Sequence, residues 1–326
     1  MSISRTPALA DVEAAAGRIR AHIHRTPLVY SRTLSELTER RVFLKCENLQ
    51  KTGSFKARGA LNCLATLSDR DRESGVITIS AGNHAQGVAY AARVFNVSAV
   101  IVMPASASPG KVAATRDYGA ECVLHGDVHA AFEKLHELKE RRGLKLIHPF
   151  EDPMLISGHG TMGLEIHDDL PQFDAIVCGI GGGSLISGIA TVSRALSPET
   201  RIYGVEPEGA ATMSAALEAG KPVRLERLDT IADGLAPPSV GALNLEITNH
   251  HVDTVTTVSD DEIRAAMTLL LERTKLLVEP AGAAALAALL EDRLPVKRGE
   301  TVVVVLSGGN VDLDRLGLLL RHPGGN

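Results

Sequence analysis

The chain has 326 residues, of which 34 are Lys or Arg and 39 are Asp or Glu, giving a formal net charge of −5, and 44% are hydrophobic. This composition is typical of a globular protein with room for about two domains, and it excludes a disordered chain. The mild acidity, with six Phe, four Tyr and no Trp, argues against a nucleic-acid partner.

Short apolar runs alternate with helical segments from about residue 75 onward. Strands are predicted at 76–79, 99–103, 121–124, 144–147, 175–177, 202–205 and 301–306, and helices at 83–95, 111–118, 129–142, 161–168, 185–196, 260–275 and 282–290. Continuous apolar strands between helices indicate parallel sheets that are covered on both faces. We therefore predict an α/β fold.

Targeting and membrane segments are not recognisable in the sequence. The N-terminus lacks the apolar core of a signal peptide, and the longest apolar stretch, 276–290, is interrupted by Glu279 and Pro280. We expect no membrane partner and a cytoplasmic protein. Free thiols in a reducing compartment are expected for the four widely spaced cysteines, Cys46, Cys63, Cys122 and Cys178.

A glycine-rich turn at 179–184 lies between the strand at 175–177 and the helix at 185–196. The free N–H groups and the dipole of a helix that begins at such a turn favour a phosphate. The spacing of Gly179, Gly181 and Ser184 is one residue short of a dinucleotide fingerprint, and Glu206 ends the next strand where a ribose-binding acid would lie. A nicotinamide-dependent oxidoreductase is therefore one interpretation.

A second segment, 51–60, carries a lysine outside any run of charges. Gly53 is expected to form a turn and Ser54 to cap a helix, so Phe55 and Lys56 fall in the first helical turn. The N-terminus of a helix disfavours cations, which lowers the pKa of a lysine placed there. A lysine that forms an imine needs such a lowered pKa.

With these segments in order, the chain resembles the fold-type II pyridoxal-phosphate enzymes over nearly its whole length. Within them it is most similar to the threonine/serine dehydratase (threonine ammonia-lyase) and serine racemase family. The resemblance rests on 51–56 (KTGSFK), 80–87 (SAGNHAQG), 181–188 (GGGSLISG), 232–234 (ADG), 279–282 (EPAG) and 307–310 (SGGN). A nicotinamide enzyme has no use for the Lys56 and Asn83 segments, so the resemblance favours pyridoxal phosphate as cofactor.

The resemblance also implies individual roles. Lys56 is the expected catalytic residue and would hold the cofactor through an imine, Asn83 would bond the 3-oxygen of its ring, and the uncharged Ser307 would face the ring nitrogen. The full set implied for cofactor binding is Phe55, Lys56, Asn83, Gly181, Gly182, Gly183, Ser184, Leu185, Gly234, Glu279 and Ser307. The set implied for substrate binding is Ser80, Ala81, Gly82, Asn83, His84 and His159.

Two positions bear on the reaction. Ala81 stands where the resembling racemases carry a serine that acts as a second acid–base group, so the resemblance implies β-elimination of L-threonine or L-serine to a 2-oxo acid and ammonia. Serine racemase stays an alternative. His159 stands where the family usually has glutamine, so a dehydratase of another 3-hydroxy amino acid is a further alternative.

The implied architecture has two domains, each an open, mostly parallel twisted sheet with flanking helices. The larger would comprise 1–75 plus 150–326 and bind the cofactor, and the smaller, 76–149, would be mobile. The chain looks like the short, catabolic type of dehydratase without a regulatory domain, and a homo-oligomer, either a dimer or a tetramer, is expected.

No metal site is expected. The positions that match the cation site of some relatives are Glu206, Ala210 and Thr212, which provide only one carboxylate.

Overall fold

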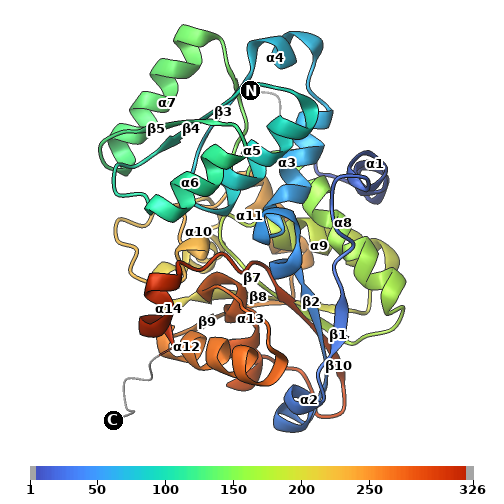
Figure 1. The fold of residues 1–326 in the computed structure, drawn as a ribbon. Coiled ribbons are helices and arrows are strands. Elements are labelled where there is room, and N and C mark those ends of the chain that lie inside the picture. Colours follow the sequence, from blue (N-terminus) through green and yellow to red (C-terminus); the bar gives the residue numbers. More distant parts are fainter. Residues whose placement is uncertain (1–4, 321–326) are drawn as a thin grey trace.

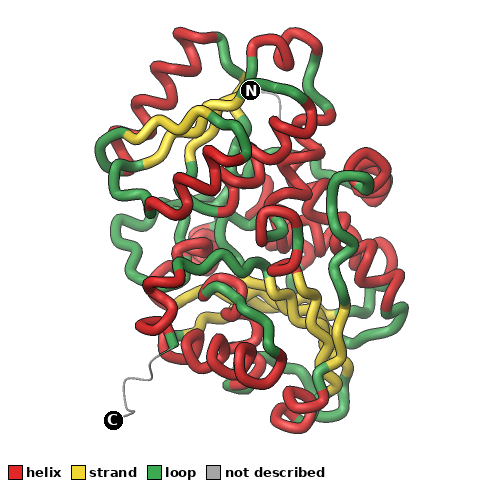
Figure 2. Tube along the Cα trace, viewed as in Figure 1, coloured by secondary structure: helices red, strands yellow, loops and turns green. Residues whose placement is uncertain are grey.

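The computed structural model describes residues 5–320, and the terminal residues 1–4 and 321–326 of the predicted larger domain lie outside this range. Its strands form two separate sheets, a six-stranded one and a four-stranded one, with helices around and between them (Figures 1 and 2). Within the described range no helix combines the length and apolarity needed to cross a bilayer. The predicted α/β fold is confirmed.

The six-stranded sheet has the order β1-β2-β10-β7-β8-β9, in which only the edge strand β1 is antiparallel. Parallel strands need crossover helices, so the chain passes over both faces of this sheet. Its strands are β1 (Leu28–Tyr30), β2 (Arg41–Cys46), β7 (Ala175–Gly179), β8 (Arg201–Pro207), β9 (Thr254–Val258) and β10 (Thr301–Leu306).

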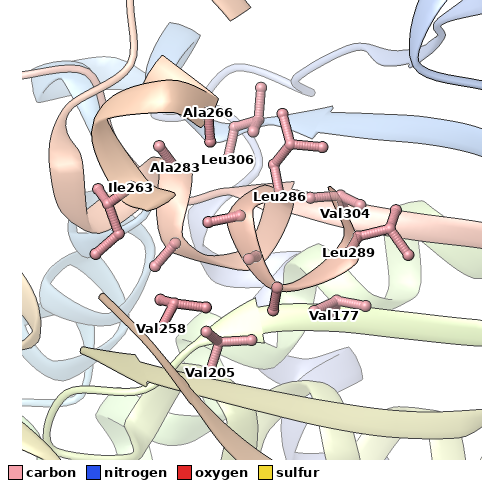
Figure 3. Packing of buried hydrophobic residues seen from close by; sticks show 14 of the residues in the cluster. Val177, Val205, Val258, Ile263, Ala266, Ala283, Leu286, Leu289, Val304 and Leu306 are labelled. Atoms are coloured by element: carbon pink, nitrogen blue, oxygen red, sulfur yellow. The ribbon is translucent and has the colours of Figure 1, made fainter. Parts of the chain in front are cut away.

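Strand β10 shows why both faces of this sheet are covered. Val302, Val304 and Leu306 pack into one core cluster, and the intervening valines pack into another on the opposite face. The first cluster is built on α13 (Pro280–Leu290), whose residues 280–289 are all buried (Figure 3). Helices α2 (Arg32–Thr38) and α12 (Asp260–Leu269) complete that face.

The second face of the six-stranded sheet is covered by a layer of longer helices. Helices α8 and α9 contact each other and α1, and α11 packs on α9. These elements are α1 (Leu9–Ile19), α8 (Pro153–Asp169), α9 (Ser184–Leu196), α10 (Thr212–Ala219) and α11 (Ala242–His251).

The four-stranded sheet has the order β5-β4-β3-β6 and is wholly parallel. All of its strands lie within the predicted smaller domain, 76–149. Helix α7 covers one face, and α3, α5 and α6 lie on the other. The elements are β3 (Val76–Ile79), β4 (Ala99–Met103), β5 (Glu121–Leu124), β6 (Lys145–Leu146), α3 (Lys56–Ala65), α4 (Asp69–Ser74), α5 (Asn83–Phe95), α6 (Pro109–Asp117) and α7 (Val128–Arg142); the last helix of the chain is α14 (Leu313–Leu319).

The helix predicted at 161–168 begins eight residues earlier, at Pro153, where the Asp152 side chain accepts from the first N–H groups. Its small residues let neighbouring helices approach closely. A Cβ on Gly158 would lie 2.6 Å from the Arg58 carbonyl oxygen, and one on Gly160 would lie 2.9 Å from that of Gly188. The glycines therefore allow α8 to pack closely against α3 and α9.

Two further expectations are corrected. Ser54 does not cap α3, because its hydroxyl is buried without a partner and Phe55 occupies the N-cap position. The helix predicted to run to Lys275 is α-helical only to Leu269. A single π-helical turn follows, and Lys275 ends it with a left-handed φ of 61°.

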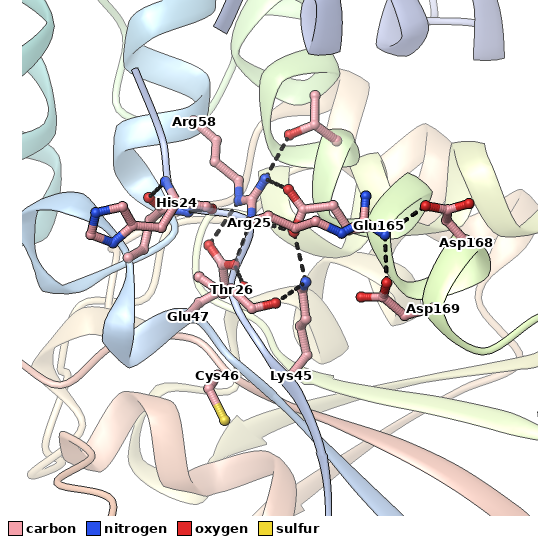
Figure 4. A network of polar contacts seen from close by, with 12 residues as sticks. His24, Arg25, Thr26, Lys45, Cys46, Glu47, Arg58, Glu165, Asp168 and Asp169 are labelled. Atoms are coloured by element: carbon pink, nitrogen blue, oxygen red, sulfur yellow. Dashed lines mark hydrogen bonds and ion pairs between the residues drawn. The ribbon is translucent and has the colours of Figure 1, made fainter. Parts of the chain in front are cut away.

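A buried ionic network fixes α3 to β2 and α8 (Figure 4). Arg58, with no exposed surface, donates from Nη2 to Glu47 at 2.7 Å and to Glu165 at 2.8 Å. Lys45, also fully buried, donates to Glu165 at 2.6 Å and to the Thr26 carbonyl at 2.8 Å. Two cations thus face two carboxylates. Burial opposes ionisation, yet Arg58 holds the pKa of Glu47 below its usual range.

We expect Arg58→Met to lower the free energy of unfolding by about 3–5 kcal/mol, because it leaves buried carboxylates without their main partner. Arg25→Ala is the matched control. Arg25 pairs with Asp168 and Asp169 at the surface with 52% of its side chain exposed, so its loss should cost at most about 1 kcal/mol. Urea unfolding followed by circular dichroism measures both, and equal losses would contradict this account of the network.

Candidate active site

The side chain of Lys56 lies at the start of α3, where the two sheets come together. Its Nζ donates to the Pro149 carbonyl at 3.1 Å and lies 5.0 Å from the centre of the Phe55 ring. The Phe55 N–H in turn donates to the Ser307 carbonyl at 3.1 Å, which ties the lysine to the end of β10. Burial lowers the pKa of Lys56 to about 8, so about a tenth of the amine is uncharged at pH 7, far more than for an ordinary lysine.

The glycine loop that follows β7 is packed too tightly for side chains. A Cβ on Gly182 would lie 2.1 Å from Cγ of Phe150, and one on Gly183, whose φ is +93°, would lie 2.7 Å from Cβ of Asn244. The Asn244 amide donates to the carbonyls of Gly182 at 2.7 Å and Phe150 at 2.9 Å. Within residues 5–320 the N–H groups of Gly181, Gly182 and Gly183 have no acceptor, which leaves them available to an anion.

A chain of amides and one carboxylate links α5 to the opposite side of the site. The Asn83 amide donates to Glu279 at 2.6 Å, and its carbonyl accepts from Asn310 at 2.8 Å. Asn310 also donates to the Thr52 carbonyl at 2.7 Å. Burial, followed by the charge of Asp233, raises the pKa of Glu279 to about 7. The Asn83 side chain is thereby held in one orientation.

Several buried hydroxyls lie beside this chain. Ser307 is 4% exposed at the end of β10, and Thr52 Oγ1 and Ser54 Oγ are buried without a partner. Gly308 packs between Ser54 and Glu279, since a Cβ there would lie 3.1 Å from Ser54 Cβ. Gly234 lies across the glycine loop, with its carbonyl 3.1 Å from the position of a Cβ on Gly181. The predicted cofactor residues are therefore gathered around one site.

The segment predicted to bind the substrate carboxylate, 80–84, forms the turn between β3 and α5. The Ser80 hydroxyl accepts from the Gly82 N–H at 3.2 Å, and Ala81 is partly buried. His84 points into the interior, with Nε2 3.1 Å from the Thr78 hydroxyl. Burial and the nearby Lys56 charge lower the pKa of His84 to about 3, so its ring is neutral.

His159 lies behind Phe55. It has no exposed surface, its ring centre is 4.7 Å from that of Phe55, and neither ring nitrogen has a partner. Burial, followed by the charge of Lys56, lowers the pKa of His159 well below its usual value. The sequence suggested that His159 contacts the substrate directly. Its burial behind Phe55 gives no support for such a contact. Its influence would pass through Phe55 or through α3, since Gly59 packs on the ring.

Glu206 has a structural partner in place of a ribose or cation. Its carboxylate accepts from the N–H groups of Met213 at 2.6 Å and Ser214 at 2.9 Å, and from the Ser214 hydroxyl at 2.7 Å. These bonds cap the first turn of α10. Across the part of the chain that the structure describes, no group of three or more His, Cys, Asp or Glu side chains is placed to hold a metal ion.

Sequence analysis missed Pro149, Phe150 and Asn244. The first two follow β6, whose two residues are too few to show a period, although ligand sites commonly lie beyond the carboxyl ends of parallel strands. Asn244 lies in the first turn of α11, and nothing local distinguishes it from an exposed residue. Only the fold brings it beneath the glycine loop.

The family model described as "pyridoxal-phosphate dependent enzyme" matches residues 19–308. The L-threonine ammonia-lyase of Thermotoga maritima is 44% identical over 96% of this chain and 78% of its own length. The L-threo-3-hydroxyaspartate ammonia-lyase of a Pseudomonas species is 41% identical over 95% of this chain and 98% of its own. Maize serine racemase superposes with a TM-score of 0.92 at 36% identity, over 96% of this chain and 97% of that structure.

The chain therefore belongs to the family of pyridoxal-phosphate dependent enzymes. Within that family it is similar over nearly its whole length to ammonia-lyases that act on 3-hydroxy amino acids and to serine racemase. The predicted resemblance is confirmed, and the nicotinamide-dependent oxidoreductase is excluded.

The residues present fit the cofactor of this family. The crowded glycine loop presents unpaired N–H groups for a phosphate, and the Lys56 amine is buried with a lowered pKa. Buried hydroxyls without partners, Thr52 Oγ1 and Ser54 Oγ, lie on the same side as Ser307. Buried polar groups are nearly always hydrogen-bonded, so these atoms point to a polar ligand.

The pKa of Lys56 predicts how attachment of pyridoxal phosphate depends on pH. Only the uncharged amine attacks an aldehyde, so the attachment rate of the apo-protein should rise with pH through about 8 and then level off. The change in cofactor absorbance after mixing measures this rate. The Lys56→Ala variant, which lacks the amine, is the control and should not show this change. A midpoint near 10.5, the ordinary lysine value, would contradict the effect of burial.

Proposed function

We propose that this chain catalyses β-elimination of a 3-hydroxy amino acid, L-threonine or L-serine, to a 2-oxo acid and ammonia. The observation that carries the proposal is the half-buried, partly uncharged amine of Lys56 between the glycine loop and the turn at 80–84. The 44% identity to an L-threonine ammonia-lyase supports the same reaction.

Pyridoxal phosphate, when bound, withdraws electrons from Cα of the amino acid that it holds, so that the Cα proton becomes removable. The free amine of Lys56 is the base that we assign to this proton, since its lowered pKa leaves part of it uncharged near neutral pH. The N–H groups of the glycine loop would hold the phosphate, and those of the turn at 80–84 the substrate carboxylate.

Two further groups favour elimination over other outcomes. Ser307 would face the ring nitrogen without a charge, and an uncharged partner leaves that nitrogen unprotonated and the electron sink weak. Asn83, fixed by Glu279 and Asn310, would bond the ring 3-oxygen. A weak sink favours prompt departure of the β-hydroxyl, which would leave as water with the proton that the Lys56 amine removed from Cα.

Two relatives support alternatives to elimination of L-threonine or L-serine. The 41% identity to an L-threo-3-hydroxyaspartate ammonia-lyase supports another 3-hydroxy amino acid as an alternative, and the likeness to maize serine racemase supports racemisation. Release of 2-oxo acid from L-threonine, L-serine and L-threo-3-hydroxyaspartate ranks the substrates.

We also propose a cytoplasmic location, supported by four cysteines that are all free, and a mobile domain at 76–149, supported by its separate sheet. We further predict a homodimer or homotetramer, and sedimentation velocity measures this oligomeric state.

We expect Lys56→Ala to lower the rate of 2-oxo acid release by several orders of magnitude, because the variant loses both the cofactor attachment and the base. Borohydride reduction of the holoenzyme followed by peptide mapping should place the cofactor on Lys56. Lys134→Ala, which changes a lysine paired with Glu137 on α7, is the matched control and should be fully active. Normal turnover by the Lys56 variant, or a label on another lysine, would contradict the proposal.

Ala81 predicts the balance between elimination and racemisation of L-serine. A methyl group cannot donate a proton to the face of Cα opposite Lys56, and an acid–base group typically contributes about 10²–10⁴-fold. Elimination should exceed racemisation by about that factor, and Ala81→Ser should raise racemisation measurably. Chiral chromatography of the remaining serine tests both expectations. Abundant D-serine from the unmodified enzyme would identify it as a racemase instead.

A further inference from the structure

Lys111 on α6 lies beside a cluster of acidic residues at the edge of the site. Lys111 Nζ contacts Asp233 Oδ2 at 2.8 Å, and only 16% of the Lys111 side chain is exposed. Burial opposes its charge, yet Asp233, Glu279 and Asp312 together raise the pKa of Lys111. This lysine therefore provides positive charge to three carboxylates that belong to the part of the chain built on the six-stranded sheet.

Two neighbouring bonds join the same parts. The Ser108 hydroxyl, just before α6, donates to Asp312 at 3.0 Å. The Asn83 amide at the start of α5 donates to Glu279 at 2.6 Å. Helices α5 and α6 pack on each other and on the four-stranded sheet. Lys111, Ser108 and Asn83 thus reach across to the other part from one rigid layer.

Glu279 connects these contacts to the site. It is 4% exposed, and the charged groups that face it are Asp233 before α11 and Lys111 on α6, while Asn83 on α5 is its neutral partner. Ionised, Glu279 accepts from the Asn83 amide. Protonated, it carries an O–H donor and no charge, so the hydrogen bond from the Asn83 N–H is no longer charge-assisted and is weaker. The charge of Glu279 therefore decides how the Asn83 amide is held.

We propose that Lys111 is a positioning residue for the elimination reaction: its ion pair with Asp233 docks α6 across the site, its positive charge favours ionised Glu279, and Glu279 in turn orients the Asn83 amide. The inference rests on the proposed function for its kinetic test only. Lys111 does not touch the reacting atoms, and its effect is transmitted through Glu279 and Asn83.

The two partners of the ion pair affect Glu279 in opposite directions. The positive charge of Lys111 lowers the pKa of Glu279, and the negative charge of Asp233 raises it. Activity that requires ionised Glu279 is lost as the pH falls through that pKa. Lys111→Met should therefore move the acidic limb of the kcat/KM profile to higher pH, and Asp233→Asn should move it to lower pH. A contact that served only stability would weaken the enzyme alike in both variants.

The kinetic test compares holoenzyme profiles between pH 5.5 and 9. For Lys111→Met we expect the acidic limb to rise by about one pH unit, which lowers kcat/KM at pH 6 about tenfold. Lys111→Arg keeps the charge and should stay within about threefold of the parent, and Lys134→Met is the control lysine on α7. An unmoved limb in Lys111→Met, or limbs that move the same way in Lys111→Met and Asp233→Asn, would overturn the proposal.

A second measurement needs no turnover. Amide hydrogen exchange of the apo-protein should be faster in α6 and at 233–235 in Lys111→Met, and unchanged in Lys111→Arg. Equal exchange in all three proteins would overturn the docking role. If the parent enzyme eliminates no 3-hydroxy amino acid, the proposed function fails while this measurement still decides the docking. Should Lys111→Met not fold, Asp233→Asn and Lys111→Arg carry both tests.

Discussion

The burial of Arg58 between Glu47 and Glu165 is the constraint on which the site depends. Arg58 lies two residues after Lys56 on α3, and its guanidinium is bonded to carboxylates from the end of β2 and from α8. A guanidinium without access to water is tolerated only when its donors are satisfied, which allows α3 a single position against the sheet. Because Lys56 is the first residue of α3, the position of this helix also fixes where the Lys56 amine lies. The same packing needs glycines at 158 and 160, where α8 meets α3 and α9.

The site itself lies where segments from both sheets meet, and each side contributes a different kind of group. The six-stranded part contributes backbone N–H groups at the glycine loop, the hydroxyl of Ser307 and the carboxylate of Glu279. The four-stranded part contributes Asn83 and the turn at 80–84. Polar bonds between the parts include those from Asn83, Ser108 and Lys111.

Charge at the site is controlled by burial more than by direct pairing. The imidazoles of His84 and His159 are buried and neutral, and the Lys56 amine has no carboxylate partner. Neither imidazole therefore carries a positive charge beside the Lys56 amine at neutral pH. The Ala81 methyl group leaves the turn at 80–84 without a side-chain acid at the second position, which is consistent with a lyase rather than a racemase.

The sequence by itself determined the α/β class, the parallel strands and the family, because apolar strands such as 99–103 and 301–306 and motifs such as 181–188 are local patterns. Their bounds agree with the structure at β3, β4, β5 and β10. The sequence could not place the start of α8 at Pro153, since the glycines in its first half are explained only by contacts with α3 and α9. Nor could it place Asn244 beneath the glycine loop, His159 behind Phe55, or Lys111 among three carboxylates. Those positions depend on residues far apart in the chain, and only the packing of the two sheets and their helices brings them together.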